Sequence, residues 1–173
     1  PRMIGSMSSP LDALFFGSVS RTLSASESLF LTGDAVAVIY RVRAGRIALN
    51  RTTPQGTVLL LQTAGEGDVL AEASTYSDRY HCDAVALEPC AVEAVPKADF
   101  ARALASDRSL AEAWERRLAH AVQEARMKSE IRTLRTVAER LDAWRSAKDG
   151  GLPPKGQWQE LASELGVSRE ALY

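Results

Sequence analysis

Short β-like runs separated by glycines are the feature that most constrains how this chain folds. Between residues 28 and 95, apolar runs such as "AVAVIYRV", "IALN" and "TVLLLQT" alternate with "RAGR", "RTTPQG" and "AGEGD". The glycines at 33, 45, 56, 65 and 67 recur every 9 to 12 residues, apart from the last close pair. Turns need residues that tolerate positive φ, and glycine does so without a Cβ clash. Many short strands at this spacing predict a sandwich, roll or barrel.

From about residue 97 the spacing of apolar residues becomes helical. "KADFARALASD" predicts a short helix, and Ser106 or Asp107 is a suitable N-cap for a second, long helix. The second helix is expected to run to about Lys148, where Gly150 and Gly151 stop it. A helix of about 40 residues is about 60 Å long, so a small β-domain cannot cover it and a second helix is needed.

The later part of this helix carries a heptad pattern. Its apolar residues are spaced four, three, four and three apart: Met127, Ile131, Leu134, Ala138 and Leu141. This spacing predicts a parallel dimer with Ile131, Leu134, Ala138 and Leu141 at the interface. The alternative is a helix buried along its own domain. Residues 102–148 carry 11 basic and 7 acidic side chains, which fits nucleic acid nearby and equally an ordinary solvated helix.

The last residues predict a helix-turn-helix. After the turn-rich "GGLPPKG", a short amphipathic helix over residues 157–165 has one apolar face, formed by Trp158, Leu161, Ala162 and Leu165. Gly166 and Val167 then make a tight turn, and Ser168 is a suitable N-cap for a second helix. A generic helical hairpin is the alternative, but "ELASELGVSRE" is more typical of DNA binding.

Three longer segments are informative together: "LFLTGDAVAVIYRVRAGRIALNRTTPQGTVLLLQTAGEGDVLAE", "SEIRTLRTVAERLDAW" and "WQELASELGVSREALY". Over residues 11–173 the chain resembles the cyclic-AMP receptor protein/FNR (CRP/FNR) superfamily of bacterial transcription regulators. The segments are similar to its β-roll, the end of its dimerisation helix and the opening of its winged helix-turn-helix. The resemblance implies an α+β fold with an N-terminal cyclic-nucleotide-binding-like β-roll (a jelly roll). We expect residues 1–9 to be disordered or vector-derived, 10–105 to form the sensor, 106–148 the dimerisation helix and 152–173 a partial DNA-binding domain.

The resemblance also implies partners and a location. It implies a cytoplasmic homodimer that binds a double-stranded DNA operator and works with RNA polymerase. The residues facing the major groove would be Ser168, Arg169 and Glu170, of which arginine suits guanine and glutamate suits cytosine. The chain ends at Tyr173, early in that recognition helix, so we expect this polypeptide alone not to read an operator properly. No apolar run is long enough to cross a bilayer, and the N-terminus does not read as a secretory signal.

The effector cassette departs from the family pattern. Family members that bind a cyclic nucleotide carry a Gly-Glu pair followed by an Arg-Ser pair whose arginine neutralises the phosphate. In "GDVLAEASTYSDRYHCDAVA", Glu72 matches the glutamate, whereas His81 and Cys82 stand in place of Arg-Ser. Arg79 lies two residues earlier and would compensate only in part. We therefore expect an effector site formed by Glu72, Arg79, His81 and Cys82 that takes a ligand other than a classical cyclic nucleotide.

Other interpretations of His81 and Cys82 stay open from the sequence. They are a cyclic-nucleotide response, a metal- or haem-based sensor, a thiol sensor with its pKa lowered by Arg79 and His81, and an ordinary strand. Adjacent strand residues point to opposite faces, so joint chelation by His81 and Cys82 is disfavoured, and we assign no metal or cofactor. We find no catalytic motif and expect no enzyme. An effector near Glu72 would contact the long helix around residues 123–131 and change the spacing of the recognition helices.

Overall fold

The structure is a computed structural model that describes residues 10–147 and 151–172. The expectations for residues 1–9, for Lys148 and Gly150 at the end of the long helix, and for Tyr173 lie outside the described residues. No helix in the described part is long and apolar enough to cross a membrane.

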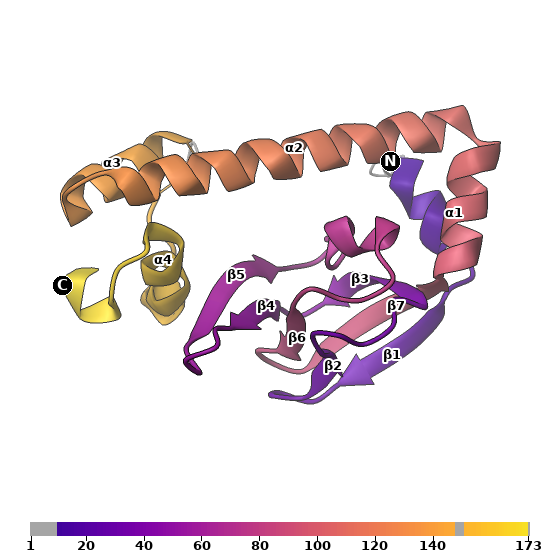
Figure 1. Ribbon diagram of the computed structural model, residues 1–173, viewed down its shortest axis with the longest axis horizontal. Helices are drawn as coiled ribbons and strands as arrows, with labels where there is room; N and C mark the ends of the chain where they lie inside the picture. The colour runs from indigo at the N-terminus through magenta and orange to yellow at the C-terminus, as the bar shows by residue number, and fades with distance from the viewer. Residues whose placement is uncertain (1–9, 148–150, 173) are drawn as a thin grey trace, which may run out of the picture.

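Two antiparallel sheets form a β-roll, as the glycine pattern predicts (Figure 1). One sheet has the order β1-β7-β3 and the other β2-β6-β4-β5. The strands are β1 (Val19–Leu23), β2 (Ser28–Phe30), β3 (Val38–Ala44), β4 (Ile47–Thr52), β5 (Val58–Ala64), β6 (Asp83–Ala86) and β7 (Cys90–Pro96). Their inward side chains form one continuous apolar core with the helices that cover it.

The β3–β4 turn shows why glycine is needed at one of the predicted turns. Gly45 has φ of 84°, and a Cβ at this residue would lie 2.7 Å from both the sulfur of Cys90 and the carbonyl oxygen of Pro89. Gly33, Gly56 and Gly67 also have positive φ, whereas Gly65 does not. The turn prediction is therefore confirmed at four of the five glycines.

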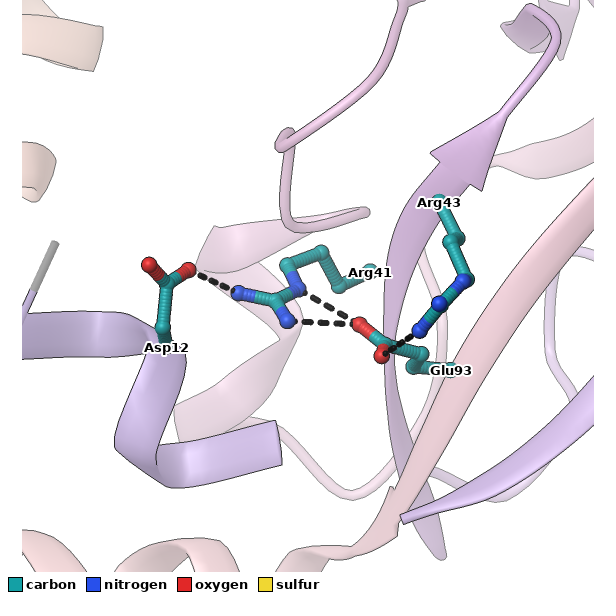
Figure 2. Close-up of polar contacts among 4 residues, drawn as sticks. All are labelled: Asp12, Arg41, Arg43 and Glu93. Carbon is teal, nitrogen blue, oxygen red and sulfur yellow. Dashed lines mark hydrogen bonds and ion pairs between the residues drawn. The ribbon is translucent and has the colours of Figure 1, made fainter. Parts of the chain in front are cut away.

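Helical segments cover the roll at the end where the chain enters and leaves it. They are η1 (Pro10–Phe15), η2 (Glu72–Tyr76) between β5 and β6, and α1 (Lys97–Ser106) after β7. A polar cluster fixes η1 to the first sheet: Asp12 pairs with Arg41 of β3, and Arg41 also pairs with Glu93 of β7 at 2.6 Å (Figure 2). The Arg41 guanidinium also lies 4.5 Å from the ring centre of Phe15. Arg41 therefore contacts η1 through both the Asp12 carboxylate and the Phe15 ring.

Helix α2 (Arg108–Thr133) runs along the length of the roll and continues past it (Figure 1). Asp107 caps it as predicted, because its side chain accepts hydrogen bonds from the backbone N–H groups of Ser109 and Leu110 at 2.8 and 3.3 Å. Trp114 is buried in the roll core, where its ring meets Phe100 of α1 edge-on. The N-terminal half of α2 thus packs on the β-roll.

The predicted long helix over residues 106–148 is interrupted, which corrects the sequence interpretation. Helix α2 ends at Thr133, Leu134 adopts an extended conformation, and a separate helix α3 (Val137–Ala147) follows. The cause is a capping box: the Glu139 carboxylate accepts from the Thr136 N–H at 2.9 Å, while the Thr136 hydroxyl accepts from the Glu139 N–H at 3.2 Å. This reciprocal pair starts a new helix where the heptad pattern predicted continuation.

The break divides the predicted dimer seam. Ile131 is buried in a second apolar core inside the same chain, with Trp144, Leu161 and Leu165, and the partly buried Leu141 packs against that core. Leu134 lies at the break and Ala138 is exposed on α3, so the four residues do not lie along one helix, and their place in a dimer interface stays a prediction.

The second core defines a small helical unit at the far end of α2 (Figure 1). It contains α3, η3 (Lys155–Gln157), α4 (Trp158–Leu165) and η4 (Arg169–Leu172). The buried face of α4 is Leu161, Ala162 and Leu165, three of the four predicted residues, whereas Trp158 is half-buried. The helix-turn-helix unit therefore includes α3 and begins before the expected boundary at residue 152.

Candidate effector site

A cavity of about 540 Å³ lies between β5, the region of η2 and one face of α2. The roll contributes Leu61, Gln62, Asp68 and Glu72, and α2 contributes residues from Arg117 to Arg132. Pockets of this size hold small organic ligands. The predicted contact between an effector near Glu72 and α2 around residues 123–131 matches the position of this cavity.

Glu72 is placed at the cavity by the turn before η2. Ala71, the N-cap of η2, has a left-handed backbone with φ of 51°, a conformation that glycine adopts more easily. The Glu72 carboxylate is largely buried and pairs with the guanidinium of Arg117 at 3.0 Å. Arg117 also contacts Asp68 at 3.4 Å, and its Nε is buried without a hydrogen-bond partner. Arg117 thus binds both carboxylates on the roll side of the cavity.

Sequence reasoning did not find Arg117. It lies three residues after Trp114 and one before Leu118, which pack on the roll core, so helical spacing places it on the same side of α2. An arginine on the apolar face of the predicted helix is the sequence feature that could have indicated a buried ion pair at Arg117.

The other predicted effector residues do not line the cavity in the described part of the chain. The exposed Arg79 donates to the carbonyl oxygen of Gly33 at 2.6 Å. His81 Nδ1 is hydrogen-bonded to the hydroxyl of buried Ser74 at 2.7 Å. The fully buried Cys82 precedes β6. Of the four predicted residues, only Glu72 reaches the cavity.

Burial sets the protonation of His81 and Cys82. It lowers the pKa of the His81 imidazole, and the nearby Arg51 lowers that pKa further. Burial also raises the pKa of the Cys82 thiol to about 11. The open alternative of a thiol sensor with its pKa lowered by Arg79 and His81 is therefore disfavoured, because the effect of burial outweighs that of the nearby Arg51.

The two cysteines lie in separate environments. Both are free and buried, and the Cys90 thiol donates to the carbonyl oxygens of Arg46 and Glu88 at 3.2 and 3.0 Å. Within residues 10–147 and 151–172, no three His, Cys, Asp or Glu side chains are grouped as a metal site would require.

The helix-turn-helix residues form an exposed edge of the second unit. Helix α4 ends at Gly166, whose φ of 66° makes the tight turn, and Ser168, Arg169 and Glu170 follow with exposed side chains. Hydrogen bonds from the Glu170 N–H and the Ser168 hydroxyl lower the pKa of the Glu170 carboxyl. These three residues are grouped at the start of η4, where the sequence placed them.

Two arginines tie this unit to α2 and α3. Arg132 donates to the carbonyl oxygens of Ser163 and Glu164 at 2.9 and 3.2 Å, and Arg140 donates to those of Leu165 and Gly166 at 3.0 and 3.1 Å. They satisfy the free carbonyl groups at the C-terminus of α4, where cations are also favoured by the helix dipole.

Comparison with known proteins identifies the roll. Residues 20–107, just over half of the chain, match the family described as "Cyclic nucleotide-binding domain". The chain belongs to the cyclic nucleotide-binding domain family. No curated protein sequence matches it.

Solved structures of CRP/FNR-type regulators share the fold of this cyclic nucleotide-binding domain protein. FixK2 from Bradyrhizobium japonicum is 16% identical, with a TM-score of 0.75 over 90% of this chain and 80% of its own. The c-di-GMP-responsive global regulator CLP from Xanthomonas campestris is 19% identical, with a TM-score of 0.69 over 92% and 85%. The catabolite activator protein of Thermus thermophilus is 22% identical, with a TM-score of 0.60 over 98% and 81%. The expected cyclic-nucleotide-binding-like β-roll is confirmed by the family match, and these structures share its fold.

Proposed function

We propose that the protein is a homodimeric, DNA-binding transcription regulator whose β-roll senses an effector other than a classical cyclic nucleotide. The observation that carries the proposal is the state of the cassette. His81 replaces the phosphate-binding arginine of the resemblance, is turned to Ser74 and is held neutral by burial. Glu72, the matching acceptor for a ribose hydroxyl, is already paired with Arg117.

Electrostatics argues against a cyclic nucleotide in this arrangement. A buried phosphodiester needs a hydrogen-bonding cation to offset its desolvation, and a neutral imidazole does not supply the charge. A ribose hydroxyl that approaches Glu72 also competes with Arg117 for that carboxylate. Each step opposes nucleotide binding.

A cyclic-nucleotide-responsive regulator is the second candidate. It is favoured by Glu72, which lies at the cavity as the resemblance requires. A thiol sensor based on Cys82 is disfavoured by the raised pKa and complete burial of the thiol.

DNA binding is supported by the geometry of the helix-turn-helix edge. Arg169 is exposed, and a guanidinium suits bidentate bonds to guanine. Selection of duplexes from a random pool by the full-length protein should enrich two half-sites about one helical turn apart, as a two-fold symmetric dimer requires.

The Arg169→Ala variant tests the contact. It should lower affinity for the selected site by about tenfold or more, because a bidentate base contact contributes about 1–3 kcal/mol. The matched control is Arg108→Ala, at the N-terminus of α2 and far from η4 in the sequence, where the side chain pairs with Glu112. Failure to enrich any sequence, or equal losses in both variants, would refute the assignment of the DNA-binding edge.

A further inference from the structure

The roll end of the cavity has no positive charge to spare for a ligand. Near η2, the single guanidinium of Arg117 pairs with both Glu72 and Asp68, at 3.0 and 3.4 Å. One turn further along α2, Glu124 also lines the cavity, with its carboxylate 3.8 Å from the ring of the exposed His120. An anionic ligand therefore meets net negative charge at this end.

The opposite end of the cavity carries two cations, Lys128 and Arg132, on one face of α2. Among the described residues, no carboxylate lies within ion-pair distance of either. Like charges four residues apart destabilise a helix, so an anion placed between them relieves repulsion as well as gaining attraction. The cavity is thus polarised, with its uncompensated positive charge at the end nearest the helix-turn-helix.

Arg132 lies between the cavity and the DNA-binding unit. It lines this cavity and also a second hollow, between β5 and residues 166–168. Its guanidinium donates to the carbonyl oxygens of Ser163 and Glu164, and its Cγ would lie 3.1 Å from a Cβ at Gly166. The same side chain therefore faces a candidate ligand and holds the end of α4.

We propose that Lys128 and Arg132 bind the anionic group of a small-molecule effector, and that Arg132 transmits binding by exchanging its bonds to α4 for bonds to that group. The ligand class is a small molecule with a phosphate or carboxylate group. This inference rests on the proposed sensor function and adds the ligand chemistry and the coupling residue.

The exchange is energetically balanced. A charge-assisted bond to an anion is stronger than a bond to a neutral carbonyl, so an anion competes for the guanidinium. The carbonyl oxygen of Ser163 keeps the backbone N–H of Gly166 at 3.2 Å as a donor, and Arg140 still holds Leu165 and Gly166. Helix α4 thus stays folded while its tie to α2 is released. A nucleotide in the cassette would place its phosphate at the other end, near η2.

Trp144 provides a reporter next to the released contact. Its indole N–H donates to the Glu164 carboxylate at 2.7 Å, so movement of the α4 terminus should shift its resonance in a ¹⁵N–¹H spectrum. The protein is titrated with inorganic phosphate and, separately, with succinate at constant ionic strength, because screening changes with added salt. We expect a saturable shift of the Trp144 indole resonance, with the tighter probe showing whether phosphate or carboxylate is preferred.

Three variants separate binding from coupling. Lys128→Gln should weaken binding by at least about tenfold, since a hydrogen bond between charged groups is lost. Arg132→Gln should abolish the response of Trp144 to the anion, and its indole resonance should already lie, without ligand, where the wild-type resonance lies with ligand. Arg126→Gln, on the exposed part of α2, should match the wild type.

Absence of a saturable response to either anion, or a response that Lys128→Gln leaves unchanged, would overturn the inference. If Arg132→Gln does not fold, the Lys128→Gln titration still decides it. Selection of a DNA site by the full-length protein is independent of this result, so failure here is distinguishable from failure of the proposed function.

Discussion

At the scale of single residues, burial decides what the cassette can do. The sequence places His81 beside Cys82, which suggests metal or redox chemistry. The structure turns His81 toward Ser74 and encloses Cys82. The His81 imidazole and the Cys82 thiol are therefore both uncharged near neutral pH. Two adjacent reactive residue types therefore become hydrogen-bonding and packing residues.

His81 gives the protein a pH-dependent stability. Its folded-state pKa lies below the ordinary value of 6.5, so the unfolded chain binds a proton first as the pH falls. The contribution of His81 is present above pH 6.5 and is lost as the pH falls toward the folded-state pKa. We expect the free energy of unfolding, measured with urea between pH 7 and 5.5, to fall with pH, and His81→Gln to reduce the slope.

The matched control is His120→Gln. This variant makes the same substitution on the exposed surface of α2, away from the cassette. Equal slopes in all three proteins would contradict the buried, neutral state of His81.

At the scale of elements, periodicity predicted most of the architecture. The glycine-separated strands, the helix after residue 97, the Asp107 cap and the buried face of α4 were all readable from the sequence. These features depend on local spacing and local hydrogen bonds, which the sequence displays directly.

Long-range packing was not readable in the same way. Ile131 continues a heptad pattern, yet its side chain packs against Trp144 and Leu161 of its own chain. The pairing of Glu72 with Arg117 joins residues 45 apart in the chain. The break after Thr133 did have a local signal, the Thr136–Glu139 capping box, which the stronger heptad spacing concealed.

The capping box predicts a measurable stability effect. Thr136→Ala should lower the free energy of unfolding by about 1 kcal/mol, the usual loss when a capping hydroxyl is removed. Thr133→Ala is the control, because the Thr133 hydroxyl bonds back to the carbonyl of Glu130 and caps nothing. Denaturant unfolding should show the smaller loss in Thr133→Ala, and equal losses would argue that α2 and α3 form one helix in solution.

At the scale of the whole molecule, α2 joins the β-roll to the second helical unit. The roll also contacts that unit directly, because Arg46 in the β3–β4 turn pairs with Glu160 of α4 at 2.5 Å and with Glu88 at 3.2 Å. A change at the cavity can therefore reach α4 by two routes, through α2 and through the roll. Two discrete arrangements of such contacts are what a ligand-controlled switch requires.

Dimer formation is expected on the side of α2 that carries Val122, whose side chain is 51% exposed. Val122→Glu should dissociate the dimer in sedimentation, since two-fold symmetry buries two unpaired charges. Gln123→Glu, at the adjacent exposed position, should leave the dimer intact. A Val122→Glu dimer as stable as the wild type would place the interface elsewhere.

We propose that this member of the family has a cavity unsuited to cyclic nucleotides. Isothermal titration calorimetry of the purified protein with cyclic AMP and cyclic GMP tests it most directly. We predict no saturable binding in the micromolar range, because His81 supplies no charge to the phosphate and Arg117 engages Glu72. Saturable binding of either nucleotide at micromolar or tighter affinity would contradict the account.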